Sequence, residues 1–139
     1  MLRVAFATSD GTVVDQHFAE CDWFAVYDLD EDESVLVASR TPATAEAGDS
    51  RIDARLAILS DCAILHVASI GGPAAARVVN ARIHPIKVPS GTPIEDLIGR
   101  LRVVLAGTPP PWLRKAIRQS VAAPAQPAGP ETVVTGGTR

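Results

Sequence analysis

The first forty residues alternate between apolar segments of strand length and short polar turns. Leu2 to Thr8 are rich in β-forming residues and end at the turn signal Ser9-Asp10-Gly11. The segments 23–29 and 34–40, WFAVYDL and SVLVASR, flank the acidic run 30–33. This pattern predicts three strands, the last two joined as a hairpin whose charged tip is a solvated loop rather than a cation site.

Beyond residue 50, apolar positions at helical spacing alternate with continuous apolar runs. After the linker 41–50, in which Ser50 is a possible N-cap, a helix to about Ser60 is predicted by the spacing of Ile52, Leu56 and Leu59. The apolar run 62–69 is typical of an inner strand buried on both faces. A helix over 72–82, with Pro73 at its first turn, then connects this strand to a parallel one over 83–88.

The last predicted helix begins at Thr92-Pro93-Ile94-Glu95, which matches a capping box, and ends at Gly107. The order βββ-α-β-α-β-α indicates an α/β fold with a mixed sheet covered by helices. We therefore expect one α/β domain over 1–107, a proline-rich segment with a short basic amphipathic turn over 108–119, and a disordered tail over 120–139.

Composition excludes several classes of protein. Of the 139 residues, 16 are acidic and 13 basic, so the net charge of −3 disfavours nonspecific nucleic-acid binding. No apolar run approaches the roughly 18–20 residues of a membrane span, and the N-terminus lacks the features of a signal peptide. We expect a cytoplasmic protein whose two cysteines are reduced thiols.

The stretch DQHFAEC places His17 and Cys21 four residues apart just after the first strand and turn. A histidine and a thiolate at this spacing can reach one soft metal centre if the backbone turns there, whereas a lone histidine near a turn is more often a surface residue. Structural zinc and ordinary iron-sulfur sites need about four protein ligands. A large preassembled cluster needs only one or two, because its own sulfides fill most coordination positions.

The stretch IGGPAAAR is the second candidate site. Gly71 and Gly72 precede a helix that begins with proline, so their N–H groups could bind an anion, with Arg77 adding positive charge one turn later. The glycines could equally serve only the conformation of a tight turn. Catalytic motifs are scarce, although Asp10 and Asp28 remain possible metal ligands of a hydrolase.

Three stretches together resemble the NifX/NafY family of nitrogenase cofactor carriers, which is related to the C-terminal domain of NifB. They are VAFATSDGTVVDQHFAECDWFAVYDL, DCAILHVASIGGPAAARVVNARIHPIKV and GTPPPWLRKAIRQ, and the resemblance extends from residue 1 to about 119. It implies a ribonuclease H-like fold and a non-catalytic protein that binds the iron-molybdenum cofactor or its iron-sulfur precursor and passes it on.

The resemblance also implies site residues and partners. The histidine of the family's HF motif falls on His17, and Cys21 aligns with a position that is cysteine in some relatives and serine in others. Expected partners are a NifB-like donor, a NifEN-like scaffold or apo-dinitrogenase, with no nucleic acid and no membrane. A NifX-like carrier is expected because no additional N-terminal domain precedes the motif. The alternative is a docking module that binds dinitrogenase or assembly proteins through PPPWLRK, with Trp112 as its anchor.

Overall fold

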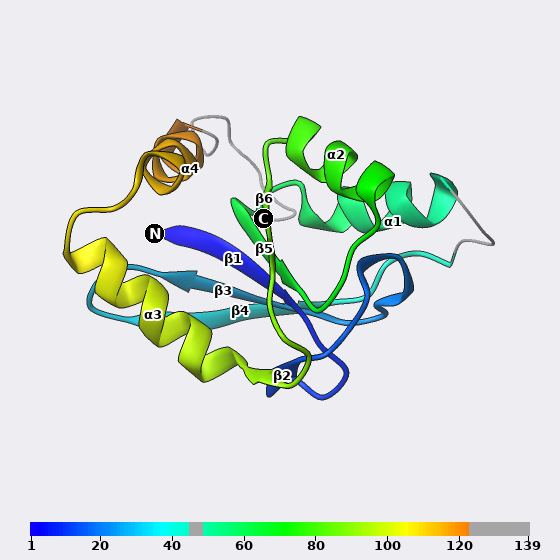
Figure 1. The fold of residues 1–139 in the computed structure, drawn as a ribbon, viewed down its shortest axis with the longest axis horizontal. Helices are drawn as coiled ribbons and strands as arrows, with labels where there is room; N and C mark the ends of the chain where they lie inside the picture. The colour runs from blue at the N-terminus through cyan, green and yellow to red at the C-terminus, as the bar shows by residue number, and fades with distance from the viewer. Residues whose placement is uncertain (45–48, 123–139) are drawn as a thin grey trace.

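A five-stranded mixed sheet forms the centre of the protein (Figure 1). The computed structural model describes residues 1–44 and 49–122. In the order β4-β3-β1-β5-β6, β1 is antiparallel to β3 and parallel to β5. The five strands are β1 (Leu2–Ala7), β3 (Phe24–Leu29), β4 (Ser34–Arg40), β5 (Ile64–Val67) and β6 (His84–Lys87). The predicted mixed α/β fold is confirmed.

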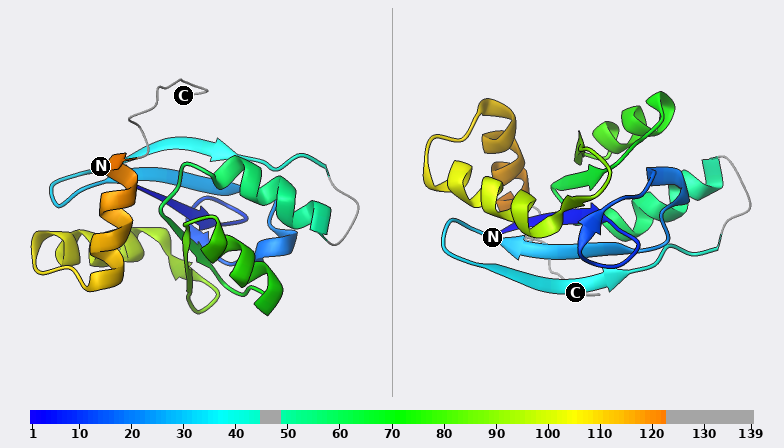
Figure 2. Two further views of the ribbon diagram at one scale, coloured as in Figure 1. Left: turned by 90° about the horizontal axis from the view of Figure 1, so that it is seen from above. Right: turned by 60° about the horizontal axis from the view of Figure 1, so that its bottom comes forward.

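Two pairs of helices cover the two faces of this sheet. Helices α1 (Asp49–Leu59) and α2 (Gly72–Asn80) share a core with Ala5 and Ala7 of β1. Helices α3 (Ile94–Ala106) and α4 (Pro111–Ala122) share a second core with Val4 and Phe6. Figure 2 shows each pair as a separate group. Within the described ranges, no helix is both long and apolar enough to cross a membrane.

The structure contains short elements that the apolar pattern did not predict. Strands β2 (Val13–Val14) and β7 (Thr92–Pro93) pair as a small antiparallel sheet, and a 3-10 helix, η1, spans Phe18–Glu20. Elements of two or three residues are too short for any periodicity to be visible in a sequence. They nevertheless fix the loop between β1 and β3.

The predicted capping box is wrong. Helix α3 begins at Ile94 with Pro93 as its N-cap, and no side chain caps it. The hydroxyl of Thr92 instead donates to the carbonyl oxygen of Pro89. Thr92 pairs with Val14, so its backbone is in a strand when the helix starts. Ser50 is not an N-cap either, because α1 begins one residue earlier.

The segment after Gly107 is a full helix rather than a short turn. Helix α4 has 12 residues, and its Leu113 and Ala116 are buried against the core shared with α3. It extends to residue 122, three positions into the predicted tail. The rest of that tail, 123–139, and the linker positions 45–48 lie outside the described residues.

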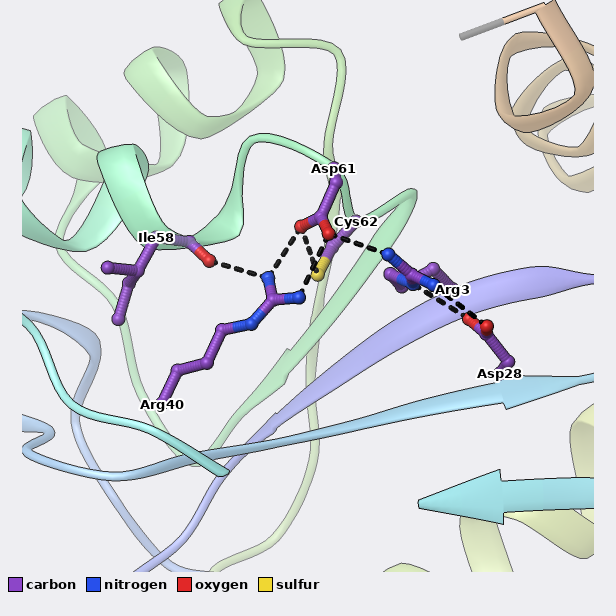
Figure 3. A network of polar contacts seen from close by, with 6 residues as sticks. All are labelled: Arg3, Asp28, Arg40, Ile58, Asp61 and Cys62. Atoms are coloured by element: carbon purple, nitrogen blue, oxygen red, sulfur yellow. Dashed lines mark hydrogen bonds and ion pairs between the residues drawn. The ribbon is translucent and has the colours of Figure 1, made fainter. Parts of the chain in front are cut away.

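A network of ion pairs joins the start of β1 to three other elements (Figure 3). Arg3 donates through Nε and Nη2 to the carboxylate of Asp28 on β3, at 2.8 and 2.9 Å. Its Nη1 reaches Asp61, which follows α1, at 2.8 Å. Arg40 on β4 donates to both oxygens of Asp61, at 2.6 and 2.9 Å, and to the carbonyl oxygen of Ile58. Asp61 therefore connects Arg3 on β1 with Arg40 on β4.

The charge on Asp61 depends on its two arginine partners. Burial alone would raise the pKa of Asp61, but the hydrogen bonds and positive charges of Arg40 and Arg3 outweigh burial and lower that pKa to about 2. An aspartate in an unfolded chain has a pKa of about 3.9. Because the folded value is lower, the stability contributed by Asp61 is complete above about pH 4 and is lost as the pH falls toward 2.

We predict that Asp61→Asn lowers the free energy of unfolding by about 1 kcal/mol at pH 7. The loss is modest because the Asp61 side chain is 41% exposed and solvent screens its ion pairs. Urea denaturation at a series of pH values measures it, and the difference from wild type should shrink below about pH 4. Asp32→Asn, at the exposed hairpin tip, is the control. A difference that does not change with pH would contradict the assigned role of the carboxylate charge.

Candidate functional site

The parallel pairing of β1 and β5 brings two loops together at the carboxyl ends of these strands. The loop after β1 leads to His17, and the segment after β5 contains Ser69. His17 and Ser69 form an isolated parallel bridge, with the Phe18 N–H donating to the Ser69 carbonyl oxygen at 2.9 Å. The Ala68 N–H donates to the carbonyl oxygen of Gln16 at 3.0 Å. In α/β sheets, ligands bind at this edge of parallel strands.

The His17 ring is held by one side chain. Its Nδ1 lies 2.7 Å from the Ser69 hydroxyl oxygen, and the histidine is half-buried. When Nδ1–H donates to Ser69, Nε2 carries the free lone pair and is the atom that can bind a metal. Ser69 is 52 residues away in the sequence, and no local pattern marked it as a partner of His17.

Phe18 anchors the loop that carries His17 to the core. Its side chain is fully buried and packs against Phe24, with ring centroids 6.3 Å apart. The buried ring therefore fixes the loop. Because Phe18 starts η1, the burial of its ring also fixes the position of the preceding histidine.

Cys21 lies in the core in this conformation. The thiol is fully buried and donates to the carbonyl oxygen of Trp23 at 3.0 Å. Burial raises the pKa of Cys21 to about 11, although the Trp23 hydrogen bond and the positive charge of Arg55 oppose the shift. A metal ligand must be the thiolate, so ligation by Cys21 would require η1 to open. No three histidine, cysteine or acidic side chains within 1–44 and 49–122 gather to hold a metal ion.

The Gly71-Gly72 turn lies next to Ser69 and is open to solvent. A Cβ added at either glycine would meet no atom within 4 Å, and neither glycine has a positive φ. Steric crowding and backbone strain therefore do not require glycine at these positions, whereas a bare backbone lets a ligand approach closely. Arg77 does not reinforce this turn, because its guanidinium pairs with Asp53 on α1.

The two candidate ligands of a hydrolase lie at opposite ends of β1. Asp10 follows the last residue of β1 and accepts from the N–H groups of Thr12 and Val13 at 2.8 and 3.2 Å. These hydrogen bonds lower the pKa of Asp10. Asp28 is held by Arg3 at the other end of the strand. The two carboxylates cannot share a metal ion.

The two remaining histidines are in structural positions. His66 is buried and stacks on Phe6, with ring centroids 4.7 Å apart. Burial lowers the pKa of His66 to about 4, although a hydrogen bond with the backbone of Ala5 opposes the shift, and its Nδ1 has no hydrogen-bond partner. His84 stacks on Trp112, the proposed docking anchor, at 4.1 Å. Leu113, the next residue, is fully buried, so removing 109–119 would disrupt the core as well as any docking surface.

Comparison with known proteins identifies relatives over most of the chain. A family model described as dinitrogenase iron-molybdenum cofactor matches residues 1–103. The chain is 40% identical to NifX of Sinorhizobium fredii over 134 residues, covering 91% of this chain and 84% of that protein. It is 39% identical to NifY of Azotobacter vinelandii over 116 residues, which is 84% of this chain and 48% of NifY. The chain thus spans about half the length of NifY.

A solved structure supports the fold. The crystal structure of PH0822 superimposes with a TM-score of 0.60 and 23% sequence identity, covering 73% of this chain and 89% of that chain. At this identity the likeness establishes the arrangement of the sheet and helices alone.

We predict that Ser69→Ala changes the tautomer of His17. In wild type, nitrogen-15 NMR of the histidine rings should show the proton of neutral His17 on Nδ1, because Ser69 accepts it. Ser69→Ala removes the acceptor and should move the population toward Nε2–H, with a loss of stability of about 1 kcal/mol. Ser69→Thr keeps the hydroxyl and is the matched control. A wild-type ring protonated on Nε2 would contradict the expected direction of the hydrogen bond, from His17 Nδ1–H to Ser69.

Proposed function

The chain belongs to the dinitrogenase iron-molybdenum cofactor family, which gives it a role in the biosynthesis of that cofactor, and we propose that it acts there as a carrier. The cargo is the iron-molybdenum cofactor or its iron-sulfur precursor, bound transiently through His17. The observation that carries this proposal is the His17 ring, fixed by Ser69 at the carboxyl ends of β1 and β5. The ring is half-buried and lies in a loop that the buried side chain of Phe18 holds in place.

A single imidazole suits a cluster better than a bare metal ion. An isolated ion takes most of its ligands from the protein, and His17 offers one. The metal atoms of a preformed cluster are already bridged by sulfide, so one protein bond can fill a remaining position. A cargo held by one bond is also released easily to a partner that offers more ligands.

The surroundings of His17 favour an anionic cargo. The N–H groups at the start of α2 lie beside Ser69, and the positive end of a helix dipole attracts negative charge. The open backbone at Gly71 and Gly72 leaves room for a bulky ligand to approach. The charge of Arg77 contributes less, because Asp53 neutralises it. Cys21 becomes a second ligand only in a form in which η1 has opened.

A carrier needs binding and release but no catalytic group. The expected exchange partners are a NifB-like donor, a NifEN-like scaffold or apo-dinitrogenase, in the cytoplasm. We also infer that the fold is ribonuclease H-like, which is supported by the strand order β4-β3-β1-β5-β6 with three antiparallel strands followed by two parallel ones.

We predict that the wild-type protein binds the isolated iron-sulfur precursor cluster and that His17→Ala binds it at least tenfold more weakly, because the proposed ligand atom is lost. Anaerobic titration followed by visible absorption, with comigration on a sizing column, measures both. His84→Ala is the matched control, since it removes an imidazole that stacks on Trp112.

The outcomes of this titration separate the possible readings. If wild type does not bind the cluster, the carrier proposal fails and docking becomes the better explanation. If wild type and His17→Ala bind equally, the cluster site lies elsewhere on the protein. A separate variant, Cys21→Ser, tests whether η1 opens when the cluster binds. It weakens binding if the Cys21 thiolate is a ligand, which requires the open form, and leaves binding unchanged if η1 stays closed.

A further inference from the structure

A polar pocket of about 410 Å³ lies beside η1, between the start of α1 and the segment that follows β4. It is separate from the face that His17 shares with Ser69, since neither residue lines it. Two arginines and two acidic residues contribute most of its polar groups. The lining includes Ala19, Glu20, Asp22, Thr44, Arg51 and Arg55.

Arg55 is the unusual member of this pocket. It is only 5% exposed, and a buried guanidinium is stable only when its N–H groups have acceptors. Its Nη1 donates to the carbonyl oxygen of Arg51 at 3.1 Å. Its Nε is buried and has no acceptor. Its Nη2 lies 3.5 Å from Asp22 Oδ1, which is longer than a strong ionic hydrogen bond.

The Nε group without an acceptor and the Nη2 group, which meets Asp22 at 3.5 Å, lie on one edge of the guanidinium. The Nε and Nη2 hydrogens of an arginine point in the same direction and form a fork that matches the two oxygens of a carboxylate. Asp22 does not fill this fork, because its side chain is 89% exposed and approaches Nη2 only. A buried donor without a partner is uncommon in native structures, and a bound ligand is one explanation for it.

We propose that this pocket binds the carboxylate group of a small organic acid, with Nε and Nη2 of Arg55 donating to its two oxygens. Arg51 adds positive charge at the pocket. Glu20 and Asp22 also line it, so a multiply charged anion such as phosphate would meet two negative side chains. A single carboxylate requires only the fork. It is therefore the ligand class that the geometry favours.

This inference goes beyond the proposed carrier function and does not require it. The pocket and the His17 site share only the η1 segment, to which Ala19 and Glu20 belong. A bound acid would contact η1 at Ala19 and Glu20. Arg55 also acts electrostatically on the Cys21 thiol, which follows η1. Binding at the pocket can thus be measured without any cluster.

The test is isothermal titration calorimetry of the full chain with propionate, a monocarboxylate, at constant ionic strength. We expect binding with a stoichiometry of one. Arg55→Lys, which keeps the charge but removes the fork, should weaken binding at least tenfold, and Arg51→Gln should weaken it several-fold. Asp22→Asn should tighten binding, because it removes a carboxylate that approaches the same fork. Arg100→Gln, an exposed arginine on α3, and His17→Ala should bind as wild type does.

Three results would overturn the proposal. The first is no propionate binding by wild type or by Asp22→Asn, which would mean that Asp22 itself satisfies Arg55 in solution. The second is phosphate binding as tightly as propionate, which would indicate a general anion site. The third is unchanged binding by both Arg51→Gln and Arg55→Lys. Circular dichroism shows whether Arg55→Lys folds. If it does not, Arg51→Gln and Asp22→Asn still test the proposal, because these two side chains are not part of the buried core.

Discussion

The parallel pairing of β1 with β5 is the constraint on which the rest of the structure depends. β1 is central, with Val4 and Phe6 in one core and Ala5 and Ala7 in the other. A strand buried on both faces has its register fixed, because a shift of one residue would exchange the two cores. The register places the end of β1 beside the end of β5. His17 and Ser69 meet because these two ends are adjacent.

The two ends of β1 have different roles. At its start, Arg3 is engaged by Asp28 and Asp61, so the charged groups there satisfy one another and hold four elements together. At its other end, the loop to β3 is held by backbone pairing and by the buried ring of Phe18, which leaves His17 accessible. The stability of the protein and its binding chemistry are therefore separated along one strand. Substitutions at the two ends should affect different properties.

The sequence predicted the larger elements because their apolar residues occur in strand-length runs or at helical spacing. The strands at 2–8, 23–29 and 34–40 and the helices after residues 50, 71 and 92 were placed within a few residues. Thr92 was misassigned because its local pattern fits a helix cap, while its pairing with Val14, distant in sequence, holds it in a strand. Helix α4 was underestimated because its buried residues face a core built by other segments.

The same limit applies to the candidate site. His17 and the glycine turn were found because each has a local motif, whereas Ser69 and Arg55 have none. Ser69 contacts the ring of His17, which lies 52 residues away in the sequence. Arg55 is notable because it is buried and its Nε has no acceptor, and neither property is visible in the sequence. Cys21 shows the converse, since its spacing from His17 suggested a ligand pair while packing placed the thiol in the core. Sequence spacing identifies which groups are near in the chain, but only the fold decides which of them face the same space.

The proposed carrier function requires a site that binds its cargo with few bonds and releases it without unfolding. The Ser69 hydroxyl can keep the His17 ring in place with or without a cargo, because its hydrogen bond uses Nδ1 and leaves Nε2 for the metal. A preorganised ligand loses little conformational entropy on binding, so one coordinate bond can give useful affinity. A second bond from Cys21 would need η1 to open and its buried thiol to ionise, both of which cost free energy. This free-energy cost disfavours a second bond from Cys21. A carrier that transfers its cargo to a partner then has only one coordinate bond to break.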